Sequence, residues 1–257
     1  MSWIALRSFP VQASCVRKLS PLLFAVVLGL VGCGVIPRDT ADQATPLHAP
    51  SIVIIGDSTV CNWPLNDNLH REGWGMHIQE YFKSDLKVSN LAVSGRSTKT
   101  FISEGRWAKA LQADPGVVLI QFGHNDSHAP TNPEATNAAT DFRDYLRKYI
   151  DEARAQGAIP VLITPMCRRT PTDNLQPYAD AMKAVAAEKK VALIDLHAAS
   201  AKLYAQLGPE GVKALEANLA GGDYDTTHFN AAGAKAMAKL VMDELPEDVP
   251  QLKAYLK

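Results

Sequence analysis

Short apolar segments alternate with helical patterns along most of this chain, and this alternation constrains the fold to the α/β class. Continuous apolar segments are typical of strands that are buried on both faces of a parallel sheet. Such segments occur at residues 51–55, 88–93, 117–121, 159–164 and 191–195. Helical periodicity or composition marks residues 75–82, 135–153, 178–190 and 230–245. Strands separated by helices predict a single three-layer α/β/α domain around a five-stranded, parallel, doubly wound, flavodoxin-like sheet.

The overall charge excludes one class of partner. The 257 residues include 26 Lys and Arg and 27 Asp and Glu, which gives a formal net charge of −1. Without a basic excess the chain has no electrostatic means of holding nucleic-acid phosphates. We therefore expect no nucleic-acid partner, and we expect the protein to be a monomer.

The first residues have the pattern of an export signal. An apolar segment at residues 21–32 ends in small residues before Cys33, and it is preceded by the basic residues Arg7, Arg17 and Lys18. This order is typical of a secretory signal peptide, and about a dozen apolar residues are too few to span a bilayer. A buried core helix is the alternative, but no amphipathic pattern or cap surrounds the segment. We predict a signal peptide at residues 1–32 and an exported protein.

The end of that segment, Leu30-Val-Gly-Cys33, resembles the cleavage site of bacterial lipoproteins. The resemblance implies cleavage before Cys33, acylation of Cys33 and attachment to a membrane of the cell envelope through the lipid. Gly34 after the cysteine is similar to lipoproteins that are sorted to an outer membrane, where the host has one. A soluble periplasmic or secreted protein is the alternative if Cys33 is not acylated.

The remaining chain divides into three parts. Residues 33–50 contain three prolines and no periodicity, which predicts a flexible tether. The alternating strands and helices define one domain at residues 51–245, and we expect residues 246–257 to form a C-terminal tail. Cys61 and Cys167 lie in the domain without the spacing of a metal site, and their pairing as a disulfide stays open.

Two motifs follow the first two strands, at the edge of the sheet where parallel folds bind ligands. Gly56-Asp57-Ser58 comes directly after the first strand, and a serine on such a turn presents its hydroxyl and its amide to the same space. It lacks the second glycine of the common Gly-x-Ser-x-Gly esterase motif. Gly95 follows the second strand, where a glycine amide can donate to an oxyanion. The alternatives are a polar turn and a turn glycine.

Two further motifs can reach the same edge. Asn125 follows the third strand, and its carboxamide is a neutral donor for a developing negative charge. Asp225 lies three residues before His228, so its carboxylate can fix the imidazole tautomer and leave the other nitrogen free to take a proton from a serine. The alternatives are a loop-capping asparagine and a polar surface loop.

Taken together, the four motifs resemble those of the SGNH hydrolases, also called GDSL-type esterases. Other segments resemble the rhamnogalacturonan acetylesterase branch of that superfamily, and the resemblance covers roughly residues 51–245. These segments are Gly56-Asp-Ser-Thr-Val-Cys-Asn62, Gly73-Trp-Gly75, Ala92-Val-Ser-Gly-Arg-Ser97, Phe122-Gly-His-Asn-Asp126, Thr164-Pro-Met-Cys-Arg-Arg169 and Thr227-His-Phe-Asn230.

The resemblance implies the SGNH-hydrolase fold and a serine esterase that removes acetyl groups from plant-wall polysaccharide, pectin backbones above all. It implies that Ser58 is the nucleophile, His228 its base and Asp225 the residue that orients the base. The oxyanion hole would consist of the amides of Ser58 and Gly95 and the side chain of Asn125. No metal and no cofactor is required.

Substrate contacts are expected at the rim of the site, where aromatic faces stack on sugars and guanidinium groups pair with carboxylates. The candidates are Trp63, Trp74, Arg96, His124, Arg168 and Arg169. The alternatives are core packing for the two tryptophans, solvated surface positions for Arg168 and Arg169, and a bracing role beside Asn125 for His124.

Three other functions compete with the acetylesterase. A lipid esterase or lysophospholipase would use the same chemistry in an apolar groove, and the polar loop at residues 124–137 argues against one. A non-catalytic lipoprotein that binds envelope polysaccharide would have an incomplete triad. A metal-dependent hydrolase could use Asp57, His124, Asp126, Asp225 and His228, but no His-x-x-x-His ligand pair accompanies them.

Overall fold

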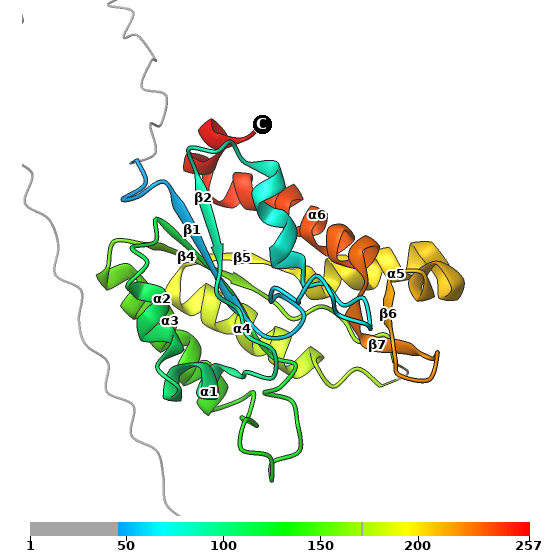
Figure 1. Cartoon of the computed structure of the whole chain (residues 1–257). Coiled ribbons are helices and arrows are strands. Elements are labelled where there is room, and N and C mark those ends of the chain that lie inside the picture. Colours follow the sequence, from blue (N-terminus) through cyan, green and yellow to red (C-terminus); the bar gives the residue numbers. More distant parts are fainter. Residues whose placement is uncertain (1–45, 171) are drawn as a thin grey trace, which may run out of the picture. The chain divides into compact units, whose positions relative to one another are not determined.

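The structure, a computed structural model, describes residues 46–170 and 172–257. Its centre is a five-stranded sheet in which every neighbouring pair is parallel, in the order β2-β1-β3-β4-β5 (Figure 1). The strands are β1 (Ser51–Gly56), β2 (Lys87–Asn90), β3 (Val117–Gln121), β4 (Ile159–Ile163) and β5 (Ala192–Ile194). The predicted five-stranded, parallel, flavodoxin-like α/β domain is confirmed.

Both faces of the sheet are covered, which explains why its strands are continuously apolar. In β1, Ile52 and Ile54 pack into one core cluster, and Val53 and Ile55 pack into another. Successive side chains of a strand point to opposite faces, so the two clusters lie on opposite sides of the sheet. All four side chains are buried.

The helices form the outer layers (Figure 1). The layer over Val53 and Ile55 contains α1 (Thr98–Ser103), α2 (Arg106–Leu111), α3 (Asp141–Ala155) and α4 (Gln176–Lys189). The opposite layer contains the 3₁₀ helices η1 (Trp74–Tyr81) and η2 (Pro250–Tyr255) together with α5 (Leu196–Lys213) and α6 (Ala231–Asp248).

Several helix boundaries differ from those expected. Residues 75–82 form the 3₁₀ helix η1, and the helix expected from residue 135 begins only at Asp141. Neither α1 nor α2 was predicted, because six residues are too few to show a helical period. Helix α5 was not predicted either. Gly208, with a φ of 67°, and Pro209 interrupt its helical periodicity.

The domain extends beyond residue 245, so the expectation of a C-terminal tail is wrong. Helix α6 continues to Asp248, and Val249 and Leu252 are buried in the core. The amide of Lys83 donates to the carbonyl of Tyr255 at 2.8 Å, which ties η2 to the segment after η1. At the other end, the amide of Ser51 donates to Ala49 at 2.8 Å. The predicted signal peptide, Cys33 and the tether up to residue 45 lie outside the described residues.

A two-stranded antiparallel hairpin lies between α5 and α6 and was not predicted. It pairs β6 (Glu216–Asn218) with β7 (Tyr224–Phe229). The side chain of Phe229 is buried in the core, and its carbonyl accepts a hydrogen bond from the amide of Glu72 at 2.8 Å. These contacts join the hairpin to the loop that follows β1. In the part of the chain that the structure describes, no helix is long and apolar enough to cross a membrane.

Candidate active site

The site lies where the order of the strands reverses. The chain passes from β1 to β2 on one side of it and then returns to β3 on the other side. The connections that follow β1 and β3 therefore leave the carboxyl ends of these neighbouring strands in opposite directions and open a crevice between them. Such a switch point is the usual binding crevice of a doubly wound sheet. Ser58 follows β1 and Asn125 follows β3, so the topology alone brings these two distant segments together.

Three side chains form a continuous hydrogen-bonded chain at this edge. The Nε2 atom of His228 lies 2.9 Å from Ser58 Oγ, and its Nδ1 atom lies 2.6 Å from Asp225 Oδ2. Ser58 comes from the loop after β1, whereas the other two come from β7. Ser58 is mostly buried, with 7% of its surface exposed. This geometry suits proton transfer from the hydroxyl to the imidazole.

Asp225 orients His228 through two kinds of contact. Its Oδ2 atom forms a hydrogen bond with Nδ1 of His228. Its Oδ1 atom accepts hydrogen bonds from the amides of Thr227 at 2.8 Å and His228 at 3.0 Å. Burial alone raises the pKa of Asp225, but the hydrogen bonds and the charge of His228 outweigh burial and lower the pKa to about 2. The carboxylate is therefore ionised at neutral pH and keeps the proton of the neutral imidazole on Nδ1.

Arg169 supports this hairpin from inside the protein, so its prediction as a rim residue is wrong. Its side chain is 1% exposed and pairs with Glu216 at 3.2 Å. The guanidinium donates to the carbonyls of Asp225 at 3.3 Å and His228 at 3.0 Å, and it lies 4.0 Å from the ring centroid of Phe229. Arg169 thus fixes the backbone of the segment that carries the triad.

Arg168 lies beside the same segment and is partly exposed. It donates to Thr227 Oγ1 at 3.3 Å and to Asn174 Oδ1 at 3.0 Å. Among the described residues it forms no ion pair with a carboxylate. Burial lowers its pKa from the usual value. Of the two arginines, Arg168 therefore places next to the triad a positive charge that has no direct ion-pair partner in the described part of the chain and that the charges of Asp57 and Asp173 reach only at longer range.

Three donors lie in the loops around Ser58. Gly95 has a φ of +78°, a conformation that favours glycine, and a Cβ there would have no neighbour within 4 Å. Among the described residues, the amides of Ser58 and Gly95 donate to no protein acceptor. Asn125 is largely buried and donates one amide hydrogen to the carbonyl of Arg96 at 3.0 Å, which leaves the other available. These donors can serve an oxyanion.

Behind the serine, Asp57 and His124 form a buried pair. His124 Nδ1 lies 3.5 Å from Asp57 Oδ2, and Asp57 Oδ1 accepts from the amide of Thr59 at 2.9 Å and its hydroxyl at 2.7 Å. Burial opposes ionisation of Asp57, but the charge of His124 and these hydrogen bonds outweigh it, so the pKa of Asp57 lies below its usual value. Burial lowers the pKa of His124. His124 is thus enclosed beside Asn125 and is not a rim residue.

Of the remaining rim candidates, Trp63 is partly exposed and Trp74 is not. Trp74 has no exposed surface and donates to Gln121 Oε1 at 2.7 Å, so it belongs to the core and its prediction is wrong. Trp63 donates from Nε1 to the carbonyl of Ser58 at 2.9 Å and meets His228 edge to face, with ring centroids 5.5 Å apart. Arg96 is partly buried and pairs with Glu104 at 3.0 Å.

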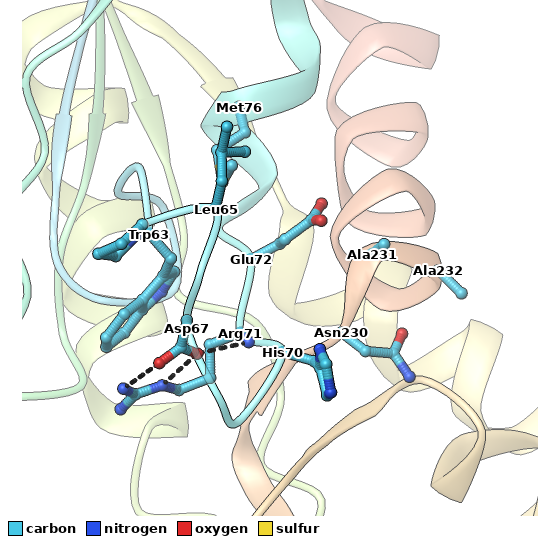
Figure 2. A pocket seen from close by; sticks show the side chains of 11 residues that line it. Trp63, Leu65, Asp67, His70, Arg71, Glu72, Met76, Asn230, Ala231 and Ala232 are labelled. Carbon is cyan, nitrogen blue, oxygen red and sulfur yellow. Dashed lines mark hydrogen bonds and ion pairs between the residues drawn. The ribbon is translucent and has the colours of Figure 1, made fainter.

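Trp63 also forms one wall of a cavity of about 310 Å³ beside the triad. Figure 2 shows Trp63 and Arg71 on one side of this cavity and Asn230, at the start of α6, on the other. The guanidinium of Arg71 lies 3.7 Å from the Trp63 ring centroid and pairs with Asp67 at 2.8 Å. Neither charged residue was predicted as part of the site, because both lie in the irregular loop between β1 and η1, where no periodicity or motif marks them.

The residues considered for a metal-dependent hydrolase do not form a metal cluster. Asp126 is buried and accepts hydrogen bonds from Thr98, Thr136 and the amide of Gly123. Burial raises the pKa of Asp126 to about 7, against those hydrogen bonds. Cys61 and Cys167 are both free thiols, so the disulfide that the sequence left open is not formed.

Comparison with known proteins agrees with this geometry. The "GDSL-like Lipase/Acylhydrolase family" matches residues 54–236. The probable rhamnogalacturonan acetylesterase YesY of Bacillus subtilis is 37% identical over 217 residues, which covers 81% of this chain and 99% of that protein. The rhamnogalacturonan acetylesterase RhgT of the same organism is 36% identical over 221 residues, which covers 80% and 93%.

A solved structure extends the comparison to three dimensions. The crystal structure of YxiM from Bacillus subtilis superposes with a TM-score of 0.64 at 33% identity, over 81% of this chain and 57% of that one. The family match spans most of the sequence, including the segments that carry Ser58, Asn125 and His228. This chain therefore belongs to the GDSL-like lipase/acylhydrolase family.

Proposed function

We propose that this protein is a serine-dependent carboxylic ester hydrolase that removes acetyl groups from a polysaccharide, with rhamnogalacturonan as the favoured substrate. The observation that carries the proposal is the uninterrupted chain from Ser58 Oγ through His228 to Asp225, with separations of 2.9 and 2.6 Å. This arrangement activates a hydroxyl for attack on an acyl carbon. It is the geometry of an acyl-transfer site rather than of a passive carbohydrate-binding surface.

In the first half of the reaction, Ser58 Oγ attacks the carbonyl carbon of the acetyl ester while His228 Nε2 takes the hydroxyl proton. The carbonyl oxygen becomes an oxyanion, which accepts hydrogen bonds from the amides of Ser58 and Gly95 and from the Asn125 carboxamide. The intermediate then collapses, the bond to the sugar oxygen breaks, and His228 returns the proton to that oxygen. The products are the free sugar hydroxyl and acetyl-Ser58.

In the second half, water replaces the sugar. His228 removes a proton from the water as it attacks the acetyl carbon, and the resulting intermediate expels Ser58 Oγ, which regains the proton. Acetate leaves the site. Asp225 stays ionised throughout and stabilises the imidazolium that forms twice in each cycle. The steps need no bound metal or organic cofactor.

The charge around the triad supports an acidic polysaccharide as substrate. Arg168 lies beside Thr227 without a carboxylate partner among the described residues, so it can pair with a galacturonate carboxylate in the substrate. Arg71 is already paired with Asp67, and its guanidinium covers one face of the Trp63 ring, so the cavity beside them suits a neutral sugar rather than a sugar acid. Two relatives match over nearly their whole length: YesY is named a probable rhamnogalacturonan acetylesterase, and RhgT is named a rhamnogalacturonan acetylesterase.

Ester hydrolysis across a panel of substrates tests this proposal, measured as acetate from the polysaccharides and as 4-nitrophenol from the model esters. The purified protein is assayed with acetylated rhamnogalacturonan, acetylated xylan, 4-nitrophenyl acetate and 4-nitrophenyl octanoate, each with a Ser58→Ala control. We expect acetate release to be fastest from rhamnogalacturonan and to be lost in the control. A preference for octanoate would identify a lipid esterase, and a folded protein inactive on every ester would contradict an enzymatic function.

We further propose that the protein is exported and is anchored to the cell envelope by a lipid on Cys33. The support is sequence alone: the basic start, the apolar segment at residues 21–32 and Leu30-Val-Gly-Cys33. Metabolic labelling with a fatty-acid analogue tests it in a bacterial host that processes lipoproteins. We expect label in the wild type and none in Cys33→Ala, and an unlabelled wild type would contradict anchoring.

A further inference from the structure

A second cluster of reactive side chains lies outside the triad, between the segment after β4 and the start of α5. Cys167, Asp173 and His197 each offer one ligand atom, and these atoms all lie within 4.8 Å of one another. Among the described residues this is the one group of three histidine, cysteine or acidic side chains with that spacing. The esterase mechanism uses none of the three.

Two of the three ligand atoms contact the third, which is a carboxylate oxygen of Asp173. Asp173 Oδ2 accepts a hydrogen bond from Cys167 Sγ at 3.3 Å and from His197 Nε2 at 2.8 Å. In a tetrahedral zinc site, bond lengths of about 2.0–2.3 Å place the ligand atoms about 3.3–3.6 Å apart. The sulfur-to-oxygen distance already matches, and the nitrogen-to-oxygen distance must widen by about 0.5 Å.

We propose that Cys167, Asp173 and His197 form a zinc site. A thiolate, an imidazole and a carboxylate together favour Zn²⁺ over Mg²⁺ or Ca²⁺, which prefer oxygen ligands only. On binding, the sulfur, nitrogen and oxygen form bonds to zinc, the thiol proton passes to solvent, and the imidazole proton moves to Nδ1. Asp173 is 24% exposed, so the metal and a fourth ligand, water, can enter from solvent.

Surrounding groups already hold two of the ligands in place. The amide of Cys167 donates to Ser200 Oγ at 2.9 Å, and Ser200 Oγ donates to the carbonyl of His197 at 3.1 Å. The amide of His197 donates to Thr164 Oγ1 at 2.8 Å. These contacts fix the backbone from which the two side chains project.

The site also lies next to the support of the triad. Cys167 and Asp173 flank Arg168 and Arg169, which donate to Thr227 and to the carbonyl of His228. A zinc ion that joins Cys167 and Asp173 to α5 would therefore fix both ends of the segment that carries the two arginines. The site is positioned to stabilise the catalytic hairpin rather than to activate the substrate.

Zinc binding by the untagged, full-length protein tests the proposal. The protein is treated with a chelator, dialysed and equilibrated with zinc chloride. Bound metal per chain is then measured by inductively coupled plasma mass spectrometry. The variants are Cys167→Ser, which keeps a hydrogen-bond donor but loses the soft ligand, and His197→Asn. The control is His128→Asn, which removes a histidine from an exposed pair with Glu134. Cobalt(II) serves as a second probe, because its bond to a thiolate absorbs in the near ultraviolet.

We expect the wild type and the His128→Asn control to bind one zinc ion per chain. We expect Cys167→Ser and His197→Asn to lose both the zinc and the cobalt–thiolate band. With free zinc at about 100 times its Kd, the midpoint of thermal unfolding should rise by about 5–10 °C in the wild type and not in those two variants. A folded wild type that binds no zinc, or zinc that stays bound in both ligand variants, would overturn the proposal and leave a hydrogen-bonded cluster only.

Discussion

The Nη2 atom of Arg169 lies 3.0 Å from the carbonyl oxygen of His228, so a buried guanidinium holds the backbone of the residue that serves as the candidate base. The same guanidinium pairs with Glu216 across the hairpin. One side chain therefore connects the segment after β4 to both strands, β6 and β7. The position of His228 depends on this internal ion pair as well as on its contact with Asp225.

Replacing Arg169 with alanine should destabilise the protein and misplace His228. The variant leaves the buried carboxylate of Glu216 without its partner, which typically costs about 3–5 kcal/mol. Urea unfolding measures the cost, and kcat for 4-nitrophenyl acetate should fall with it. The matched control is Arg147→Ala, whose pair with Glu188 is exposed to solvent and should contribute far less to stability. Equal losses in the two variants would contradict this role of Arg169.

The sheet and the grouping of the triad could be predicted because each depends on local sequence. The strands are continuous apolar segments, and Ser58, Asn125 and the Asp225–His228 pair each lie in short motifs at or near strand ends. The topology then brings these motifs together, because the carboxyl ends of parallel strands lie at one edge of the sheet.

The functions of other side chains could not be predicted, since they depend on tertiary contacts. Arginine and tryptophan are typical of sugar-binding rims. Inside this protein, however, Arg169 pairs with Glu216 and Trp74 donates a hydrogen bond to Gln121. The cluster of Cys167 with His197 joins residues 30 positions apart, without a local motif to indicate it.

Removing the carboxamide of Asn125 should lower catalysis with little change in substrate binding. Asn125→Ala deletes one of three donors available to the oxyanion, and such a loss typically lowers kcat by about 10²–10³-fold. Steady-state kinetics with 4-nitrophenyl acetate measures it. Asn132→Ala, on the exposed part of the same loop, is the control and should keep wild-type kcat. A KM effect without a kcat effect would remove Asn125 from the oxyanion hole.

The carboxylate of Asp225 should contribute to stability in a defined pH range. Its folded-state pKa of about 2 lies below the usual aspartate value of 3.8, so the contribution is present above pH 4 and is lost as pH falls through 2. Wild type and Asp225→Asn are compared by urea unfolding at pH 5 and pH 2. The difference in their free energies of unfolding should shrink by about 2 kcal/mol at the lower pH. A pH-independent difference would contradict the lowered pKa.

Arg168 should matter for acidic polysaccharide more than for small esters. Arg168→Gln keeps hydrogen-bond donors but removes the positive charge beside Thr227. We expect KM for acetylated rhamnogalacturonan to rise about 10-fold, as for the loss of one charge-assisted hydrogen bond, and KM for 4-nitrophenyl acetate to change much less. The same increase for both substrates would mean that Arg168 acts through the triad and not through the sugar acid.

The most direct test of catalysis by Ser58 is to trap the activated serine as a covalent phosphoryl adduct. The protein is inactivated with an organophosphate ester, which reacts with activated serines, and is then examined by intact mass and peptide mapping. We predict one adduct per chain, located on Ser58, absent from Ser58→Ala and formed far more slowly in His228→Ala. An adduct on another residue, or full esterase activity in Ser58→Ala, would contradict catalysis by Ser58.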